Sequence, residues 1–183
     1  MQALIRRKNT RRILLYKRID ALVNKNDPKW RNGYLYAVRL LSVTNRSAEE
    51  LLKRLADKGY EPEITKEIIK ELENQGILND QKLVRETVNW GIHGKRLGRL
   101  RIKLELKKRG IRNGVIDEAL ESYEKATESD LAKTLAKERW EKLDRMEVRL
   151  RKKRVYDFLL RRGFEFELSR DVVNQLGKSD EDV

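Results

Sequence analysis

Few residues of this chain have the types and spacing that enzyme chemistry requires. The chain contains one histidine, His93, and no cysteine, so histidine dyads and thiolate metal sites lack their partners. Carboxylate pairs such as Glu118 and Glu121 lie in segments rich in Lys and Arg, where solvated ion pairing is the ordinary role. No GxxxxGKS/T or GxGxxG phosphate-binding loop is present. We therefore expect no catalytic site, no metal site and no cofactor.

Basic residues are in excess, and they form clusters. The chain carries 43 Lys and Arg against 30 Asp and Glu, a net charge of +13. Nine basic residues lie between positions 95 and 112, and a second group lies at 149–154. Such an excess favours polyanionic partners, although a solvated helix face remains the alternative for either cluster. The candidate binding residues are Arg96, Arg99, Arg101, Lys103, Lys107, Lys108, Arg109, Arg149, Arg151, Lys152, Lys153, Arg154, Arg161 and Arg162.

The first cluster contains a regular spacing. Arg99, Lys103 and Lys107 are four residues apart, so on a helix they form one ridge opposite Ile102 and Leu106. Such a ridge can neutralise phosphates but carries no base-specific information. We expect it to contact a phosphate backbone or an acidic protein groove.

The elements that must position these residues are helices. Ala, Leu, Glu, Lys and Arg dominate the chain, which has two prolines and ten glycines. With 39% hydrophobic and 40% charged residues, it suits thin layers of amphipathic helices. No apolar run approaches the length of a membrane span, and the basic N-terminus lacks the apolar core of a signal peptide. We expect a cytoplasmic protein that does not contact membranes.

Three glycines mark an internal repeat. Gly59, Gly110 and Gly163 are 51 and 53 residues apart, and each follows a basic residue. Aliphatic residues stand eight and four positions before each glycine, and an apolar residue follows it. This spacing predicts a helix that ends at a left-handed glycine, followed by a second helix that packs against it. The aliphatic residues before the glycines are Leu51 and Leu55, Ile102 and Leu106, and Val155 and Leu159.

Each helical hairpin needs a third helix to cover it. Segments 34–43, 80–92 and 130–143 have the composition of that helix, and Ser47 with Glu50 predicts a capping box before the first hairpin. We therefore predict an all-α protein in which three tandem three-helix repeats form an elongated, curved array. The expected divisions are a basic extension at 1–33, repeats at 34–80, 81–130 and 131–176, and an acidic tail at 177–183.

The basic extension does not fit the repeat. It holds ten Lys and Arg against two Asp and Glu. Residues 11–24 are interpreted as an amphipathic helix stopped by Asn26-Asp27-Pro28. Two short strands around Lys8-Asn9 are the alternative.

Three motifs stand out around the repeat glycines: RSAEELLKRLADKGY at 46–60, GRLRIKLEL at 98–106 and FLLRRGF at 158–164. Through them, residues 34–176 resemble the RecX family of bacterial recombination regulators. The strongest match is GRLRIKLEL at 98–106 followed by RGI at 109–111, which is similar to the family pattern Gly-Pro-x-Arg-Ile-x-x-Glu-Leu and its Lys-Gly-Ile or Lys-Gly-Val. Arg99 departs from the usual proline and Arg109 from the usual lysine. A further resemblance is GILND at 76–80.

The resemblance implies a crescent of three repeats that docks in the groove of the RecA recombinase filament. It implies a negative regulator that restrains RecA ATP hydrolysis, strand exchange and co-protease activity, and so acts in DNA repair, recombination and the SOS response. It also implies contact with single- or double-stranded DNA without sequence preference. Separately, we expect the protein to be a monomer. Two other classes stay open, namely a standalone DNA-binding module that uses the 1–33 arm, and a scaffold or ribosome-associated helical protein.

Overall fold

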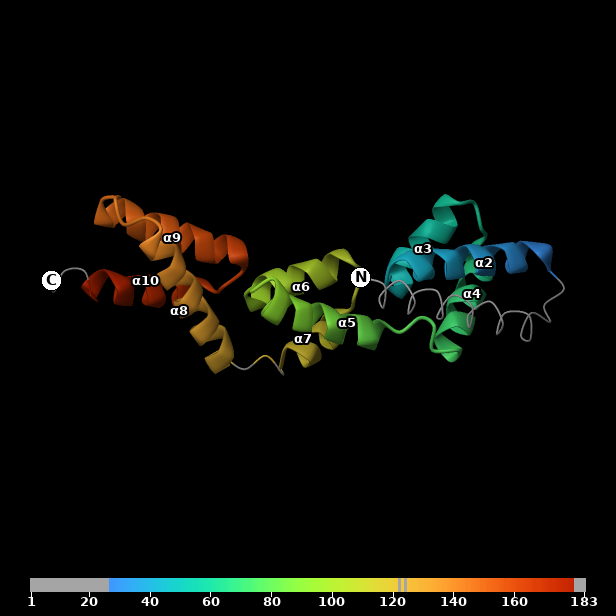
Figure 1. Ribbon diagram of the computed structural model, residues 1–183. Helices are drawn as coiled ribbons and strands as arrows, with labels where there is room; N and C mark the ends of the chain where they lie inside the picture. Colours follow the sequence, from blue (N-terminus) through green and yellow to red (C-terminus); the bar gives the residue numbers. More distant parts are fainter. Residues whose placement is uncertain (1–26, 122, 124, 180–183) are drawn as a thin grey trace, which may run out of the picture. The chain divides into compact units, whose positions relative to one another are not determined.

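The computed structural model describes residues 27–121, 123 and 125–179 (Figure 1). In these residues the chain forms nine α-helices and one short π-helical turn, with no strand. The chain divides into two compact units, Met1–Leu83 and Val84–Val183. The all-α fold is therefore confirmed, whereas the helix or strands expected at 11–24 lie outside the described residues.

The first unit contains a three-helix bundle of α2 (Pro28–Val43), α3 (Ala48–Asp57) and α4 (Pro62–Asn74). Helix α2 begins earlier than the expected Tyr34, so residues 28–33 belong to the first helix and not to a separate extension. Asp27 and Pro28, expected to stop an earlier helix, also start this one. The Asp27 carboxylate accepts a hydrogen bond from the Lys29 backbone N–H at 2.9 Å, and proline suits the first helical turn.

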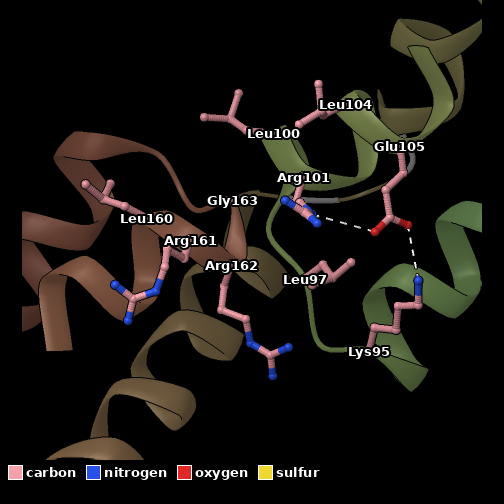
Figure 2. Close-up of a pocket in the computed structure, with 10 residues that line it drawn as sticks. All are labelled: Lys95, Leu97, Leu100, Arg101, Leu104, Glu105, Leu160, Arg161, Arg162 and Gly163. Carbon is pink, nitrogen blue, oxygen red and sulfur yellow. Dashed lines mark hydrogen bonds and ion pairs between the residues drawn. The ribbon is translucent and has the colours of Figure 1, made fainter. Parts of the chain in front are cut away.

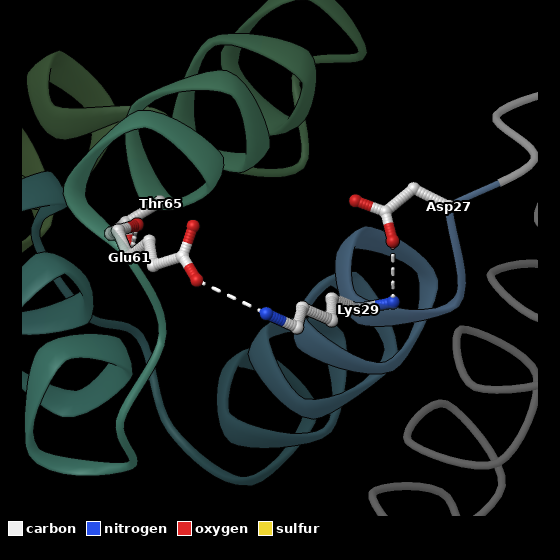
Figure 3. A network of polar contacts seen from close by, with 4 residues as sticks. All are labelled: Asp27, Lys29, Glu61 and Thr65. Atoms are coloured by element: carbon white, nitrogen blue, oxygen red, sulfur yellow. Dashed lines mark hydrogen bonds and ion pairs between the residues drawn. The ribbon is translucent and has the colours of Figure 1, made fainter.

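A polar network joins the start of α2 to the start of α4 (Figure 3). The Lys29 ammonium donates to a Glu61 carboxylate oxygen at 3.1 Å, and the Thr65 hydroxyl donates to the Glu61 backbone carbonyl at 2.9 Å. Both side chains of the Lys29–Glu61 pair are more than half exposed, so the pair adds little stability.

Aromatic and aliphatic side chains stabilise the first unit. The Trp30 and Tyr34 rings stack with centroids 5.1 Å apart, and both are buried with Leu51, Leu55 and Ile68. Their burial removes large apolar areas from water, which is the main favourable contribution to folding. The predicted Ser47–Glu50 capping box at the start of α3 is present.

The second unit contains the end of α5 (Asp80–Asn89), the π-helical turn Trp90–Gly94 and five further helices. Helix α8 begins at Lys125 rather than at the expected Asp130. Trp140 is 4% exposed and belongs to the core, whereas Trp90 is 61% exposed. The further helices are α6 (Arg99–Lys108), α7 (Asn113–Glu121), α8 (Lys125–Glu141), α9 (Val148–Arg162) and α10 (Phe166–Ser179).

The glycine repeat is confirmed at atomic detail. Gly59, Gly110 and Gly163 have φ values of 89°, 76° and 88°, the left-handed region that suits glycine. The N–H of the following residue bonds back to the carbonyl four positions before the glycine, at 3.1–3.2 Å in all three repeats. The aliphatic residues at positions eight and four before each glycine are at most 1% exposed. Among the described helices, none is both long and apolar enough to cross a lipid bilayer.

Candidate functional site

The second and third repeats meet at the amino end of α6. The first N–H groups of a helix have no acceptor within it and need one elsewhere. Here the Gly98 N–H donates to the Arg162 carbonyl and the Leu100 N–H to the Gly163 carbonyl, both at 3.0 Å. The carboxyl end of α9 therefore caps the amino end of α6, which joins the two repeats through backbone groups.

A buried carboxylate from the third repeat completes this cap. Glu128, in the first turn of α8, is 4% exposed and accepts a hydrogen bond from the Arg99 backbone N–H at 2.7 Å. The Arg99 guanidinium lies 3.5 Å from the same carboxylate and donates to the Tyr123 carbonyl. Burial raises the pKa of Glu128, and the hydrogen bond and charge of Arg99 oppose that rise. Arg99 therefore compensates a charge that would otherwise be buried alone.

A second ion pair ties the loop before α6 to α8. Arg96 has a φ of 56°, which is unusual for a residue other than glycine. Its guanidinium makes two hydrogen bonds to the Glu138 carboxylate, at 2.8 and 3.0 Å. The same hydrogen bonding lowers the pKa of Glu138 below its ordinary value. Arg96, expected to bind a partner, is therefore ion-paired between the loop before α6 and α8.

Two of the three residues of the expected cationic ridge on α6 are engaged in contacts within the chain. Arg99 is held at the junction, and the Lys103 ammonium is ion-paired with Asp117 of α7. Arg101 lies 3.7 Å from Glu105 and is otherwise exposed. Lys107 and Lys108, at the end of the helix, are exposed, and Arg109 is half-buried. Apart from Arg101, the exposed basic residues of α6 therefore lie at its carboxyl end.

The second basic cluster lies on α9 and is divided in a similar way. Arg151 donates to the Trp140 carbonyl at 2.9 Å and stacks 4.2 Å from the Trp140 ring, so it packs against the core. Arg149, Lys153 and Arg154 are exposed, whereas Lys152 is half-buried. Near the end of the helix, Arg161 is exposed and the half-buried Arg162 lies against the Phe158 ring.

A surface hollow of about 650 Å³ lies between α6 and α9 (Figure 2). Three of its leucines are large exposed apolar residues: Leu100 is 48%, Leu104 43% and Leu160 37% exposed. Glu105 lies between two of the hollow's cations, 3.3 Å from Lys95 and 3.7 Å from Arg101. The remaining lining residues are Leu97, Arg161, Arg162 and Gly163.

This hollow was not among the sites expected from the sequence. Leu100 and Leu104 are four residues apart and lie on a different side of α6 from the buried Ile102 and Leu106. A second apolar face on one helix was the signal that could have indicated it. Leucines, cations and one ion-paired carboxylate can bind a partner, but as a set they do not make a nucleophile with a general base.

The comparison with protein families matches all three repeats. The first, second and third three-helix domains of RecX match residues 34–72, 79–120 and 126–173 respectively. The matches follow the order of the repeats along the chain. Together they cover more than half of it, and each includes the glycine-centred hairpin of its repeat or most of it.

Individual relatives agree with the domain matches. The chain is 32% identical to the regulatory protein RecX of Pelodictyon phaeoclathratiforme, over 72% of this chain and 81% of the relative. It is 28% identical to that of Clostridioides difficile, over 79% and 68%. A crystal structure of RecX from Lactobacillus salivarius has the same fold, with a TM-score of 0.73 at 24% identity, over 81% of this chain and 96% of that one. The chain therefore belongs to the RecX family of regulatory proteins.

Proposed function

We propose that this chain is a monomeric cytoplasmic regulator that binds the RecA–DNA filament and restrains its ATPase, recombinase and co-protease activities. The observation that carries the proposal is the ordered match of three RecX three-helix domains along one chain. RecA is the partner that membership of this family implies. The binding is proposed to occur in the groove of the filament.

A rigid junction between the second and third repeats supports restraint by docking. A bound protein shifts an equilibrium only if it binds one state better than another. A surface whose two repeats are joined by backbone hydrogen bonds keeps a fixed spacing between α6 and α9. Such a surface fits one arrangement of adjacent RecA protomers better than others, so its binding opposes the rearrangements that accompany turnover.

A second candidate function is binding to bare DNA. It is favoured by exposed cations at the end of α6, Lys107 and Lys108, and on α9, Lys153 and Arg154. Contacts of this kind neutralise phosphates without reading sequence, and they weaken steeply as salt increases. In this case the basic arm at 1–33 would supply the main contact.

Reversing the exposed charge of α9 tests the filament proposal. The double variant Lys153→Glu with Arg154→Glu is expected to weaken binding to the RecA filament on single-stranded DNA by about tenfold at moderate ionic strength, because two attractive contacts become repulsive. The loss should shrink at high salt, where surface charges are screened. Co-sedimentation of the chain with filaments at two salt concentrations measures both effects.

A matched variant reverses two other exposed cations, both lysines. Lys66→Glu with Lys70→Glu, on α4 of the first repeat, changes the net charge by the same amount. We expect it to weaken filament binding by less than about threefold, a difference below 1 kcal/mol. Equal losses for the two double variants would mean that α9 has no particular part in docking.

A further inference from the structure

We propose that the hollow between α6 and α9 is an anchoring pocket for a segment of the protein partner that carries a large apolar side chain flanked by carboxylates. This inference rests on the proposed function and adds to it the chemistry of the contact. It concerns a site that the basic-residue pattern alone does not indicate.

The exposed leucines of the hollow are the first reason to expect that it binds an apolar side chain. Leu100, Leu104 and Leu160 expose between 37% and 48% of their surface within one concave region. Exposed leucines scattered singly need no explanation, whereas leucines gathered in one hollow can contact the same apolar side chain of a partner. The volume of about 650 Å³ lies within the range of about 300–1,000 Å³ usual for ligand sites. The hollow is therefore large enough to receive bulky side chains.

The charged residues that line the hollow, called its rim here, are the second reason, because they favour a partner with carboxylates. Four cations and one carboxylate line the hollow, and that carboxylate, Glu105, already lies near both Lys95 and Arg101. Arg161 has no ion-pair partner within the described part of the chain. The Nε–H of Arg162 is buried and finds no acceptor among the described residues. The rim therefore offers more positive charge than its own carboxylate can satisfy, which favours an acidic segment.

The residue types that line the hollow favour a protein segment over nucleic acid or a second copy of this chain. Nucleic acid binds cations and aromatic stacking surfaces, whereas the exposed apolar surface here comes from leucines. A second copy of this chain is disfavoured because every copy carries a net charge of +13 and the rim is itself basic. A protein segment with both apolar and acidic groups satisfies both parts of the hollow.

The pocket is an anchor within a larger contact. Specific protein interfaces bury about 1,200–2,000 Å² in total, and a few buried side chains supply most of their energy. Helix α9, which contributes Leu160 to the hollow, also carries the exposed cations Lys153 and Arg154. The partner's apolar side chain would give the interface its central contact, and its carboxylates would meet Arg161 and neighbouring cations.

The variant Leu104→Lys tests the pocket in the full-length chain. It removes an apolar group and adds a positive charge, so any general electrostatic attraction to an acidic filament is preserved or increased. We expect its affinity for RecA filaments on single-stranded DNA to fall about tenfold, the loss of one anchoring contact. The affinity of the Leu104→Ala variant, which adds no charge, is expected to fall about threefold to tenfold. Fluorescence anisotropy of the labelled chain titrated with filaments measures each.

The control is Leu150→Lys, the same change at a leucine of α9 that is 54% exposed and does not line the hollow. Its affinity should stay within about twofold of the unmodified chain, and circular dichroism should show equal helicity for all variants. Unchanged binding by both Leu104 variants, with binding by the unmodified chain intact, overturns the pocket while leaving the proposed function in place. Absence of filament binding by the unmodified chain overturns both.

Other occupants give distinguishable results. If Leu104→Lys converts an oligomer of the chain into monomers in analytical ultracentrifugation, the hollow is a contact between copies and the proposal is wrong. If Leu104→Lys weakens binding to bare single-stranded DNA as much as binding to the filament, the hollow faces DNA and the proposal is also wrong.

Discussion

Replacing Gly163 with alanine is expected to lower the free energy of unfolding of the Val84–Val183 unit by about 3 kcal/mol, with comparable contributions from backbone strain and from overpacking. Gly163 has a φ of 88°, where an L side chain costs about 1–2 kcal/mol. A methyl group there would also lie 2.8 Å from the Cα of Arg101 and closer still to its backbone nitrogen. These are backbone atoms, so no side-chain rotation relieves the clash.

The clash would separate the end of α9 from the start of α6. Separation breaks the hydrogen bonds from Gly98 to Arg162 and from Leu100 to Gly163, and it leaves the first N–H groups of α6 without their acceptors. Urea denaturation followed by circular dichroism measures the change in stability.

The equivalent glycine of the first repeat is the control. Gly59 has a φ of 89°, yet a methyl group on it would meet no atom within 4 Å. Gly59→Ala should therefore cost its own unit only the conformational strain, about 1–2 kcal/mol. Equal losses for the two variants would show that Gly163 acts only as a helix terminator and does not dock against α6.

Replacing Arg99 with alanine is the second large expected effect. Removing one partner of a buried ion pair costs about 3–5 kcal/mol because the other charge stays behind without compensation. Glu128 is 4% exposed, and in the variant it would keep, among the described residues, the bond from the backbone N–H of residue 99. We expect a loss of about 3 kcal/mol in urea denaturation.

A second substitution, at Glu128, distinguishes the effect of the uncompensated buried charge from the effect of lost side-chain packing. Glu128→Gln removes the buried charge but keeps an oxygen that can accept from the same backbone N–H. Added to Arg99→Ala, it should restore about 1–2 kcal/mol, because the double variant leaves no lone buried charge. A double variant less stable than Arg99→Ala alone would contradict the view that Arg99 compensates Glu128.

The repeat could be predicted from the sequence because its causes are local. A glycine with aliphatic residues four and eight positions before it defines both the end of a helix and its buried face. Leu55, Leu106 and Leu159 are therefore buried as predicted. The start of α2 was missed because Asp27-Pro28 can either follow one helix or begin the next, and only tertiary packing decides.

The junction could not be predicted because its contacts join distant residues. Periodicity shows which face of a helix is buried but not which residue caps its end. Nothing in the spacing indicates that Glu128 accepts from Arg99, or that Arg96 pairs with Glu138. For this reason basic residues that looked equivalent in the sequence divide into structural cations and exposed ones. The exposed cations, together with the leucine hollow, form the candidate docking surface.

The most direct test of the proposed function is ATP hydrolysis by RecA on single-stranded DNA with increasing amounts of the chain. We predict that the hydrolysis rate falls between substoichiometric and equimolar amounts of chain to RecA, since a docked regulator opposes the rearrangements of turnover. An unchanged rate at equimolar chain would contradict the account.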